Sequence, residues 1–528
     1  MIDTWTTKKA MVTGSGGMVA AQHVTAAEAG AAVLERGGNA MDAAITTALV
    51  LSVVEPWLSG IGGGGFILHR NGATGETQAL DFNMVSPAAI DPADYPLVEG
   101  HDGDWFNWPA VKDDRNLIGP RSICVPGAIA GFAEALARHG TISFAEALAP
   151  AIEEAEKGLR VDWFTELALT IDAPNLATDP TSAAIYLVDG KPPRLPEGKA
   201  SCRLPLGNKA KTLKRLAEAG AQDFYTGEIG RALVEDFAAM GCLITADDLA
   251  AYRPRWMTPL SIAYRDAKIH AMPGLSGGPA FAGALEALQA GDAFKNRPGE
   301  PPKGRHYAAY ADAVRSAYAH RLTQAGHASS AKADPGCTSH LSVVDAAGNV
   351  VALTNTLLSR FGSKVTSPAT GITMNNGVMW FDPRPGQPNG IAPGVKPLAN
   401  MCPLIADTAD GATIAVGAAG GRQIFPALVQ ILSFCIDFDM DIGAALSQPR
   451  IDASAPKIRV DRRVTPEAAG MIAARHDVEV VDDVLYPVQF AIPSAVTRHA
   501  DGRVDGMVHP NHPWSAAVAA DTKSSEAT

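Results

Sequence analysis

Thr338 stands between a polar stretch, residues 324–337, and an alternating segment that reads Thr-Ser-His-Leu-Ser-Val-Val-Asp. A threonine hydroxyl becomes a good nucleophile when its own α-amino group is free to act as the base. That amino group titrates at about pH 8, so a substantial fraction is neutral at physiological pH and can accept the hydroxyl proton. The chemistry requires the chain to be cut between Cys337 and Thr338.

Other catalytic motifs are weak or missing. The run Gly60–Gly65 contains GxGxxG, but the strand-like segment 66–69 follows it where a dinucleotide site needs a helix. We interpret these glycines as positions of close backbone approach. The 13 histidines form no HExxH motif, the six cysteines form no CxxC, and neither GxSxG nor SxxK occurs. The sequence therefore predicts no metal and no cofactor.

The strand that begins at Thr338 needs partners. Alternation predicts a hairpin of strands 338–344 and 350–357 joined by a turn at 345–349. Further strands are expected near 402–407, 412–417, 457–460 and 478–481, and two more lie between 60 and 82 around a turn at Asn71-Gly72.

Helices are expected mainly in the first half of the chain. Capping-box patterns at Thr25–Glu28, Ser143–Glu146 and Thr245–Asp248 each open a helical run. Other helical runs cover 39–52, 211–220, 227–240, 277–289, 305–323, 422–436 and 465–475. Helices early and strands after 338 indicate a layered domain that contains a sheet, and not alternating βαβ units.

Composition excludes several functional classes. Among 528 residues, 47% are hydrophobic, so long disorder is excluded, and the net charge is −12, which disfavours a nucleic acid partner. No run of 18 apolar residues occurs, so we expect no membrane span. The first residues lack an apolar signal segment and the cysteines are scattered, so we expect a cytoplasmic protein with unpaired thiols.

Ordered blocks along most of the chain resemble the gamma-glutamyltransferase family of N-terminal-nucleophile hydrolases. They include the segments 17–44, 53–68, 125–132, 223–230, 276–278, 338–357, 361–363, 371–376 and 418–424. The resemblance implies an α+β fold, an αββα sandwich, made as one precursor that cuts itself into two subunits. The large subunit would comprise residues 1–337 and the small subunit 338–528, together forming a heterodimer and one structural domain.

The resemblance also implies roles for four residues. Thr338 matches the new N-terminus and nucleophile, and Thr356 matches a second threonine that hydrogen-bonds the nucleophile's hydroxyl. Gly420 and Gly421 match the glycine pair whose backbone N–H groups form the oxyanion hole. Glycines suit this task because the missing side chains let backbone donors come close to the substrate.

Several family positions that grip an α-amino-acid head group are changed. Asn83 stands where the family has an arginine for the α-carboxylate, and Trp380, just after Asn376, stands where an aspartate holds the α-ammonium. Ala399 and Asn400 replace a serine pair. The lid region, 382–395, also looks shorter than in many members. We therefore expect Asn83, Asn376, Trp380 and Asn400 to line a site for a different acyl group.

The sequence thus predicts an amidohydrolase or acyltransferase whose partners are a small amide substrate and water or an amine acceptor. The branch, cephalosporin-acylase-like or oxamate-amidohydrolase-like, stays open. A carboxylate on the acyl group would need a cation, and Arg121, Arg360, Arg384 and Arg422 lie near matched motifs. One alternative is a conventional gamma-glutamyl transferase or glutathione hydrolase. A second is an unprocessed, non-catalytic scaffold.

Overall fold

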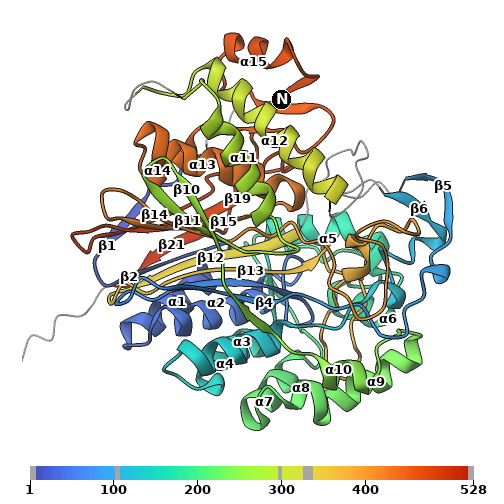
Figure 1. Ribbon diagram of the computed structural model, residues 1–528. Helices are drawn as coiled ribbons and strands as arrows, with labels where there is room; N and C mark the ends of the chain where they lie inside the picture. The colour runs from blue at the N-terminus through green and yellow to red at the C-terminus, as the bar shows by residue number, and fades with distance from the viewer. Residues whose placement is uncertain (1–6, 102–107, 295–299, 325–336, 521–528) are drawn as a thin grey trace, which may run out of the picture.

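Two seven-stranded sheets stack face to face, and helices cover both outer faces, which gives four layers (Figure 1). The computed structural model describes residues 7–101, 108–294, 300–324 and 337–520. In Figure 1 the helices α1–α4 lie below the stacked strands and α11–α15 lie above them. This αββα arrangement is the one expected from the sequence.

We name each sheet after a central strand. The β12 sheet has the order β21 (Ala516–Ala519), β2 (Gly17–Ala21), β12 (Cys337–Asp345), β13 (Val350–Leu358), β3 (Gly64–Arg70), β4 (Thr77–Phe82) and β9 (Arg255–Met257). The β15 sheet has the order β1 (Val12–Gly14), β20 (Val504–Val508), β19 (Ile492–Arg498), β15 (Thr413–Ala419), β14 (Leu404–Asp407), β11 (Ala267–Ala271) and β10 (Leu260–Tyr264).

The helices form the two outer layers. The β12 sheet carries α1 (Val24–Glu35), α2 (Ala40–Val54) and α3 (Ala128–His139), with α4 (Phe144–Lys157) and α7 (Lys209–Ala219) outside them. The β15 sheet carries α11 (Gly278–Ala290), α13 (Ile424–Phe438) and α14 (Ile442–Ser447), with α12 (Gly304–Gln324) and α15 (Pro466–Ala473) outside.

Smaller elements surround this frame. The helices are α5 (Trp163–Leu176), α6 (Pro180–Tyr186), α8 (Asp223–Thr226), α9 (Glu228–Met240) and α10 (Ala246–Ala251). The strands are β5 (Leu97–His101), β6 (Pro109–Val111), β7 (Leu159–Val161), β8 (Cys202–Leu204), β16 (Ile451–Asp452), β17 (Ile458–Asp461) and β18 (Val478–Val481). None of the helices in the described ranges is long and apolar enough to cross a membrane.

The period of two along β12 sorts its side chains between two cores. Leu341 and Val343 join the apolar cluster between the β12 sheet and its helices, whereas Val344 joins the cluster between the two sheets. A third cluster lies between the β15 sheet and its helices. Because both faces of the central strands are buried, the register of β12 is strongly specified.

A row of polar side chains lies on the inter-sheet face of β12 and β13. His340 Nδ1 lies 2.9 Å from Thr354 Oγ1, and its Nε2 lies 3.0 Å from Ser342 Oγ. Ser494 Oγ, on β19, donates to the carbonyl of His340 at 3.1 Å. Burial lowers the pKa of His340 to about 3, so its ring is neutral and its two nitrogens serve as one donor and one acceptor.

Most expected elements are present, with three differences. The hairpin, the strands of 402–481 and the capping boxes at Ser143 and Thr245 match the structure. Helix α1 is instead capped by His23, whose Nδ1 accepts from the Thr25 amide at 3.2 Å, so the expected cap at Thr25 is wrong. Strands β1, β2, β9, β10 and β11 show that the first 337 residues contribute more of the sheets than the sequence indicated, and β19, β20 and β21 were also missed.

Replacement of Gly417 on β15 tests the spacing between the sheets. A Cβ at this position would lie 2.3 Å from Cε1 of the His340 ring. We expect Gly417→Ala to destabilise the protein by about 1–3 kcal/mol through overpacking, seen as a lower urea midpoint. Gly470→Ala, within α15, is the control, because nothing lies within 4 Å of its added Cβ. Equal midpoints for the two variants would contradict this account.

Candidate active site

Thr338 and Thr356 face each other across the β12–β13 pair. The Thr338 hydroxyl donates to Thr356 Oγ1 at 3.4 Å, and the Leu358 amide donates to the same Thr356 oxygen at 2.8 Å. Thr338 is 2% exposed and Thr356 is fully buried. The register of the pair shifts between Cys337 and Ser339, so the irregularity falls on the predicted nucleophile. The arrangement orients the Thr338 hydroxyl before any substrate binds.

Glycines on β3 and before it let the backbone approach β13 closely. A Cβ at Gly63 would lie 2.0 Å from the carbonyl oxygen of Thr356, and one at Gly65 would lie 2.0 Å from that of Thr354. These distances exclude any side chain at either position. The interpretation of residues 60–65 as positions of close backbone approach is therefore confirmed. These glycines let the chain pack directly against β13, the strand that carries Thr356.

Gly420 and Gly421 lie directly after the last paired residue of β15. Their φ angles are 134° and 50°, which favour glycine, and a Cβ at Gly420 would also lie 2.9 Å from Cα of Ala491. The chain turns here into the short 3-10 segment 421–423 that precedes α13. Two successive backbone amides at such a turn are the kind of donor set that stabilises an oxyanion.

A mostly apolar cavity adjoins Gly420. It is lined by Trp57, Leu58, Phe164, Leu167, Ala168, Ile171, Arg360, Gly420, Tyr486, Val488, Ile492 and His512. The Leu58 carbonyl accepts from the Leu357 amide at 3.3 Å, which places this cavity at the end of the β12–β13 hairpin where Thr338 lies. The cavity and the two threonines therefore share one end of the stacked sheets.

Only one of the four candidate arginines lines this cavity. Arg360 does so, and its Nε contacts Asp172 at 2.5 Å, while Lys364 Nζ lies 3.8 Å from the same carboxylate. Arg121 pairs with Asp94 and Arg384 pairs with Asp382. Arg422 is buried with its guanidinium over the Tyr318 ring. Of the four candidate arginines, Arg360 is thus the one that shares a cavity with Gly420.

The predicted substrate-binding residues are not brought into one cavity. Asn83 is buried and lines a different cavity, with Lys396, Arg253 and Arg255 among its neighbours. Asn376 uses its amide within the protein, donating to the Leu117 carbonyl and to Ser359 Oγ at 2.9 Å each. Their roles in binding stay predictions.

Trp380 fills space between the sheets. Its side chain is 4% exposed and belongs to the apolar cluster that includes Leu358, Ala399 and Met401. Its backbone carbonyl accepts from Asn389 Nδ2 at 2.6 Å. A bulky indole therefore occupies this position, and its surroundings are too apolar to stabilise a charged group.

Arg321 was missed by the sequence reasoning. This buried residue of α12 donates to the Ala399 carbonyl at 2.6 Å, and its Nη2 lies 3.4 Å from Asn400 Oδ1. Burial lowers its pKa to about 10, so it stays charged at neutral pH. The Asn400 Nδ2 atom is buried and has no hydrogen-bond partner in the described structure. Arg321 thus holds the side-chain oxygen of Asn400, while the Asn400 NH₂ group makes no hydrogen bond to any described residue.

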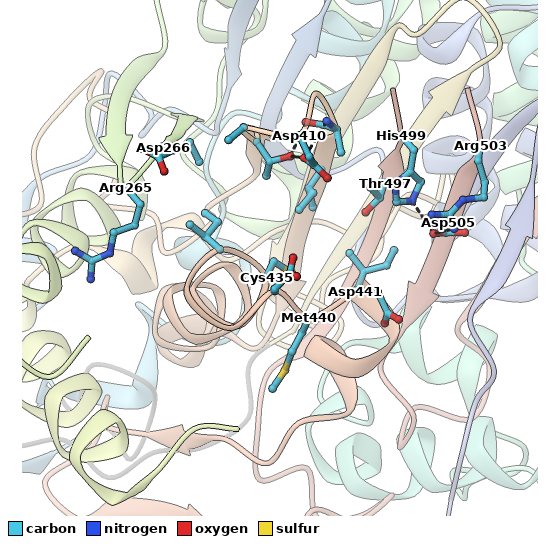
Figure 2. A pocket seen from close by; sticks show the side chains of 18 residues that line it. Arg265, Asp266, Asp410, Cys435, Met440, Asp441, Thr497, His499, Arg503 and Asp505 are labelled. Atoms are coloured by element: carbon cyan, nitrogen blue, oxygen red, sulfur yellow. Dashed lines mark hydrogen bonds and ion pairs between the residues drawn. The ribbon is translucent and has the colours of Figure 1, made fainter. Parts of the chain in front are cut away.

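A second polar cavity lies at the far end of α13 (Figure 2). In Figure 2 its labelled acidic and basic residues come from the strands of the β15 sheet, from the loops beside them and, for Asp441, from the N-terminus of α14. Asp505 contacts His499 and Arg503 within this group, at 2.7 and 2.5 Å. None of the predicted site residues lines it. No group of three metal-ligating side chains occurs among the described residues.

The four layers, and the position of Thr338 at the start of a central strand, are those of an N-terminal-nucleophile hydrolase. The structure resembles that of cephalosporin acylase from Bacillus halodurans, with a TM-score of 0.83 and 24% identity, covering 98% of this chain and 99% of that chain. At this identity the likeness establishes the fold.

The chain belongs to the gamma-glutamyltranspeptidase family, whose sequence profile matches residues 26–335 and 323–519. It is 34% identical over 502 residues to the acylase ACY 1 proenzyme of Pseudomonas sp. strain V22, covering 89% of this chain and 88% of that protein. It is 31% identical over 508 residues to the glutathione hydrolase proenzyme of Escherichia coli strain K12, covering 87% and 85%. The protein is therefore an enzyme of this hydrolase family.

Thr356→Val tests the hydroxyl pair, since valine keeps the shape and removes the acceptor. We expect turnover to fall on the order of 10²-fold, as for loss of one preorganised polar partner. Thr497→Val is the matched control, because this strand threonine is buried with no hydrogen-bond partner for Oγ1 among the described residues. Comparison of kcat for both variants decides the question. Unchanged turnover in Thr356→Val would make Thr356 an ordinary strand residue.

Proposed function

We propose that this protein is a self-processing amidohydrolase or acyltransferase that uses Thr338 as an N-terminal nucleophile and prefers an acyl group other than γ-glutamyl. The observation that carries the proposal is the hydrogen bond from the Thr338 hydroxyl to Thr356 at the start of the central strand. The turn at Gly420-Gly421 lies at the same end of the sheets and supports it.

In the proposed reaction the free α-amino group of Thr338 takes the hydroxyl proton, and the oxygen attacks the amide carbonyl. The amides of Gly420 and Gly421 stabilise the oxyanion. The proton passes to the leaving amine, and an acyl ester forms on Thr338. Water or an amine acceptor then attacks this ester and releases the acyl group. The attacking water or amine supplies the electron pair for the new bond, and one of its protons returns to the Thr338 oxygen.

The proposed acyl preference rests on the absence of charged partners for a γ-glutamyl head at the two matched positions. A γ-glutamyl head carries a carboxylate and an ammonium, and burial of either charge without a partner costs several kcal/mol. The matched positions offer neutral Asn83 and the buried indole of Trp380. The cavity beside Gly420 is apolar apart from Arg360 and His512. We expect an acyl group with an apolar chain to bind in this cavity. The end of the chain is either neutral or a carboxylate near Arg360.

A conventional γ-glutamyl activity is the second candidate. Lys396 lines the cavity that contains Asn83, and its Nζ contacts Asp81 at 2.8 Å. This lysine is a cation next to the position of the missing arginine, and the glutathione hydrolase of Escherichia coli is 31% identical to the chain. The substrate series described below separates the two candidates.

The two-subunit organisation, 1–337 and 338–528, and the cytoplasmic location belong to the same proposal. The segment 325–336, part of the loop expected before the cut, lies outside the described residues. Cys124, Cys202, Cys242, Cys402 and Cys435 are free thiols, which suits a reducing compartment. A thiol count on unreduced, denatured protein checks this part of the proposal.

Cleavage before Thr338 is the first test. We expect intact mass to show two polypeptides corresponding to residues 1–337 and 338–528. Thr338→Ala lacks the attacking hydroxyl, so it should remain one uncut chain without amidase activity. A wild-type protein that is fully active as a single chain would remove the N-terminal nucleophile from the mechanism.

Acyl preference is measured with anilides that share one leaving group. We expect kcat/KM for glutaryl and for neutral apolar acyl anilides to exceed that for γ-glutamyl anilide by at least about tenfold, the equivalent of about 1.4 kcal/mol. The reason is the missing partner for the ammonium group. If kcat/KM is instead about tenfold higher for the γ-glutamyl anilide, the conventional transferase is favoured, and the assignment of Thr338 as nucleophile is unaffected.

A further inference from the structure

A buried carboxyl group lies next to the predicted nucleophile. Glu55 caps the C-terminus of α2, where its amide donates to the Leu51 carbonyl at 3.0 Å, and its side chain is fully buried. The Ser339 hydroxyl faces the carboxyl group, and His512 Nε2 lies 3.6 Å from Oε1. Ser339 is the residue directly after Thr338, so the carboxyl faces a side chain one residue beyond the bond that would be cut.

These groups are poorly satisfied. Both carboxyl oxygens of Glu55, the hydroxyl of Ser339 and Nδ1 of His512 lack a well-formed hydrogen bond to any described atom. Buried polar atoms without partners are rare and call for a reason such as a catalytic task. The atoms come from three distant parts of the chain, so their meeting is a feature of the fold and not of one loop.

The environment favours the protonated form of Glu55. Burial raises its pKa well above the usual range, although the Ser339 hydroxyl opposes this shift. The C-terminal end of a helix carries partial negative charge, which also disfavours a carboxylate. Burial lowers the pKa of His512 well below its usual value, so the imidazole is neutral. Both shifts favour the uncharged forms, a carboxylic acid beside a neutral imidazole.

Self-cleavage needs a group of this kind. In the uncut chain the nitrogen of Thr338 belongs to the Cys337–Thr338 peptide bond and cannot act as a base. When the Thr338 oxygen attacks the Cys337 carbonyl carbon, the C–N bond breaks and a C–O ester bond forms. The hydroxyl loses one proton and the departing nitrogen gains one. A neutral carboxylic acid can supply the second proton and accept the first.

We propose that Glu55, acting through the Ser339 hydroxyl, is the proton relay for self-cleavage of this chain. The acid gives its proton to the departing nitrogen of Thr338 and recovers the proton that the Thr338 hydroxyl loses. Water then hydrolyses the ester, adding its hydroxyl to the Cys337 carbonyl carbon and its proton to the Thr338 oxygen. After the cut, the free α-amino group serves as the base, so Glu55 acts mainly in maturation.

The inference rests on the self-cleavage proposed above, and Glu55→Gln tests it separately. Glutamine has the shape of the protonated acid and keeps a donor and an acceptor, so a purely structural role survives the change. It cannot relay a proton. We expect the purified uncut chain to accumulate and to cleave on the order of 10²-fold more slowly, followed by intact mass against time. The thermal midpoint should stay near that of the wild type.

Two further variants make the test decisive. Glu35→Gln changes an exposed glutamate at the end of α1 and should cleave at the wild-type rate. Ser339→Ala removes only the connecting hydroxyl and should slow cleavage as well, so it decides the matter if Glu55→Gln does not fold. Wild-type cleavage rates in both Glu55→Gln and Ser339→Ala would overturn the relay. A wild-type chain that never cuts would overturn the proposed function instead.

Comparison of the rate of self-cleavage with the kcat of the cut enzyme gives a second readout. Once Glu55→Gln has been cut, its kcat for the preferred anilide should lie within a few-fold of the wild-type value, because the base is then the α-amino group. Loss of turnover equal to the loss of cleavage would place Glu55 in the substrate reaction and contradict the relay as stated.

Discussion

The antiparallel pairing of β12 with β13 is the interaction on which the rest of the structure depends. It sets Thr338 opposite Thr356 and aligns the polar row of His340, Ser342 and Thr354 between the sheets. Burial of hydroxyl and imidazole groups costs free energy unless they are hydrogen-bonded, so the row favours one register. The glycines against β13 and at position 417 keep neighbouring backbone and rings close enough to maintain it.

Much of this frame could be predicted from local sequence, and the exceptions have a common cause. The hairpin alternates and ends in a clear turn, and the caps at Ser143 and Thr245 use short-range hydrogen bonds. Strands such as β2 and β19 are buried on both faces, so no polar alternation marks them. The cap of α1 was misjudged because a histidine ring nitrogen replaced the expected hydroxyl.

Some residues of the predicted site could likewise be found from the sequence, and others only from the structure. The predicted nucleophile Thr338, Thr356 and the glycine pair occupy short matched motifs, so resemblance could point to them. The resemblance gave no defined role to Glu55, which lies inside a matched block, or to Arg321 and Arg360. Each of the three makes a contact with a residue more than 70 positions away. Burial identifies Glu55 and Arg321, and the shared lining of the cavity beside Gly420 identifies Arg360; these properties exist only in the folded chain. Sequence departures at Asn83 and Trp380 indicated what is missing from the site, whereas contacts were needed to see what is present.

The order of strands determines how two chains made by a cut before Thr338 would hold together and refold. In the β12 sheet, β2 and β3 flank the pair β12–β13, and in the β15 sheet, β14 lies between β15 and β11. Strands from before and after residue 337 therefore pair with one another in both sheets, and neither part keeps all the strands of either sheet without the other. A cut at this point would leave two chains that fold together once, as one precursor. Such halves would not exchange with those of another molecule, and after full denaturation their recovery would be limited by kinetics and not by the stability of the native state.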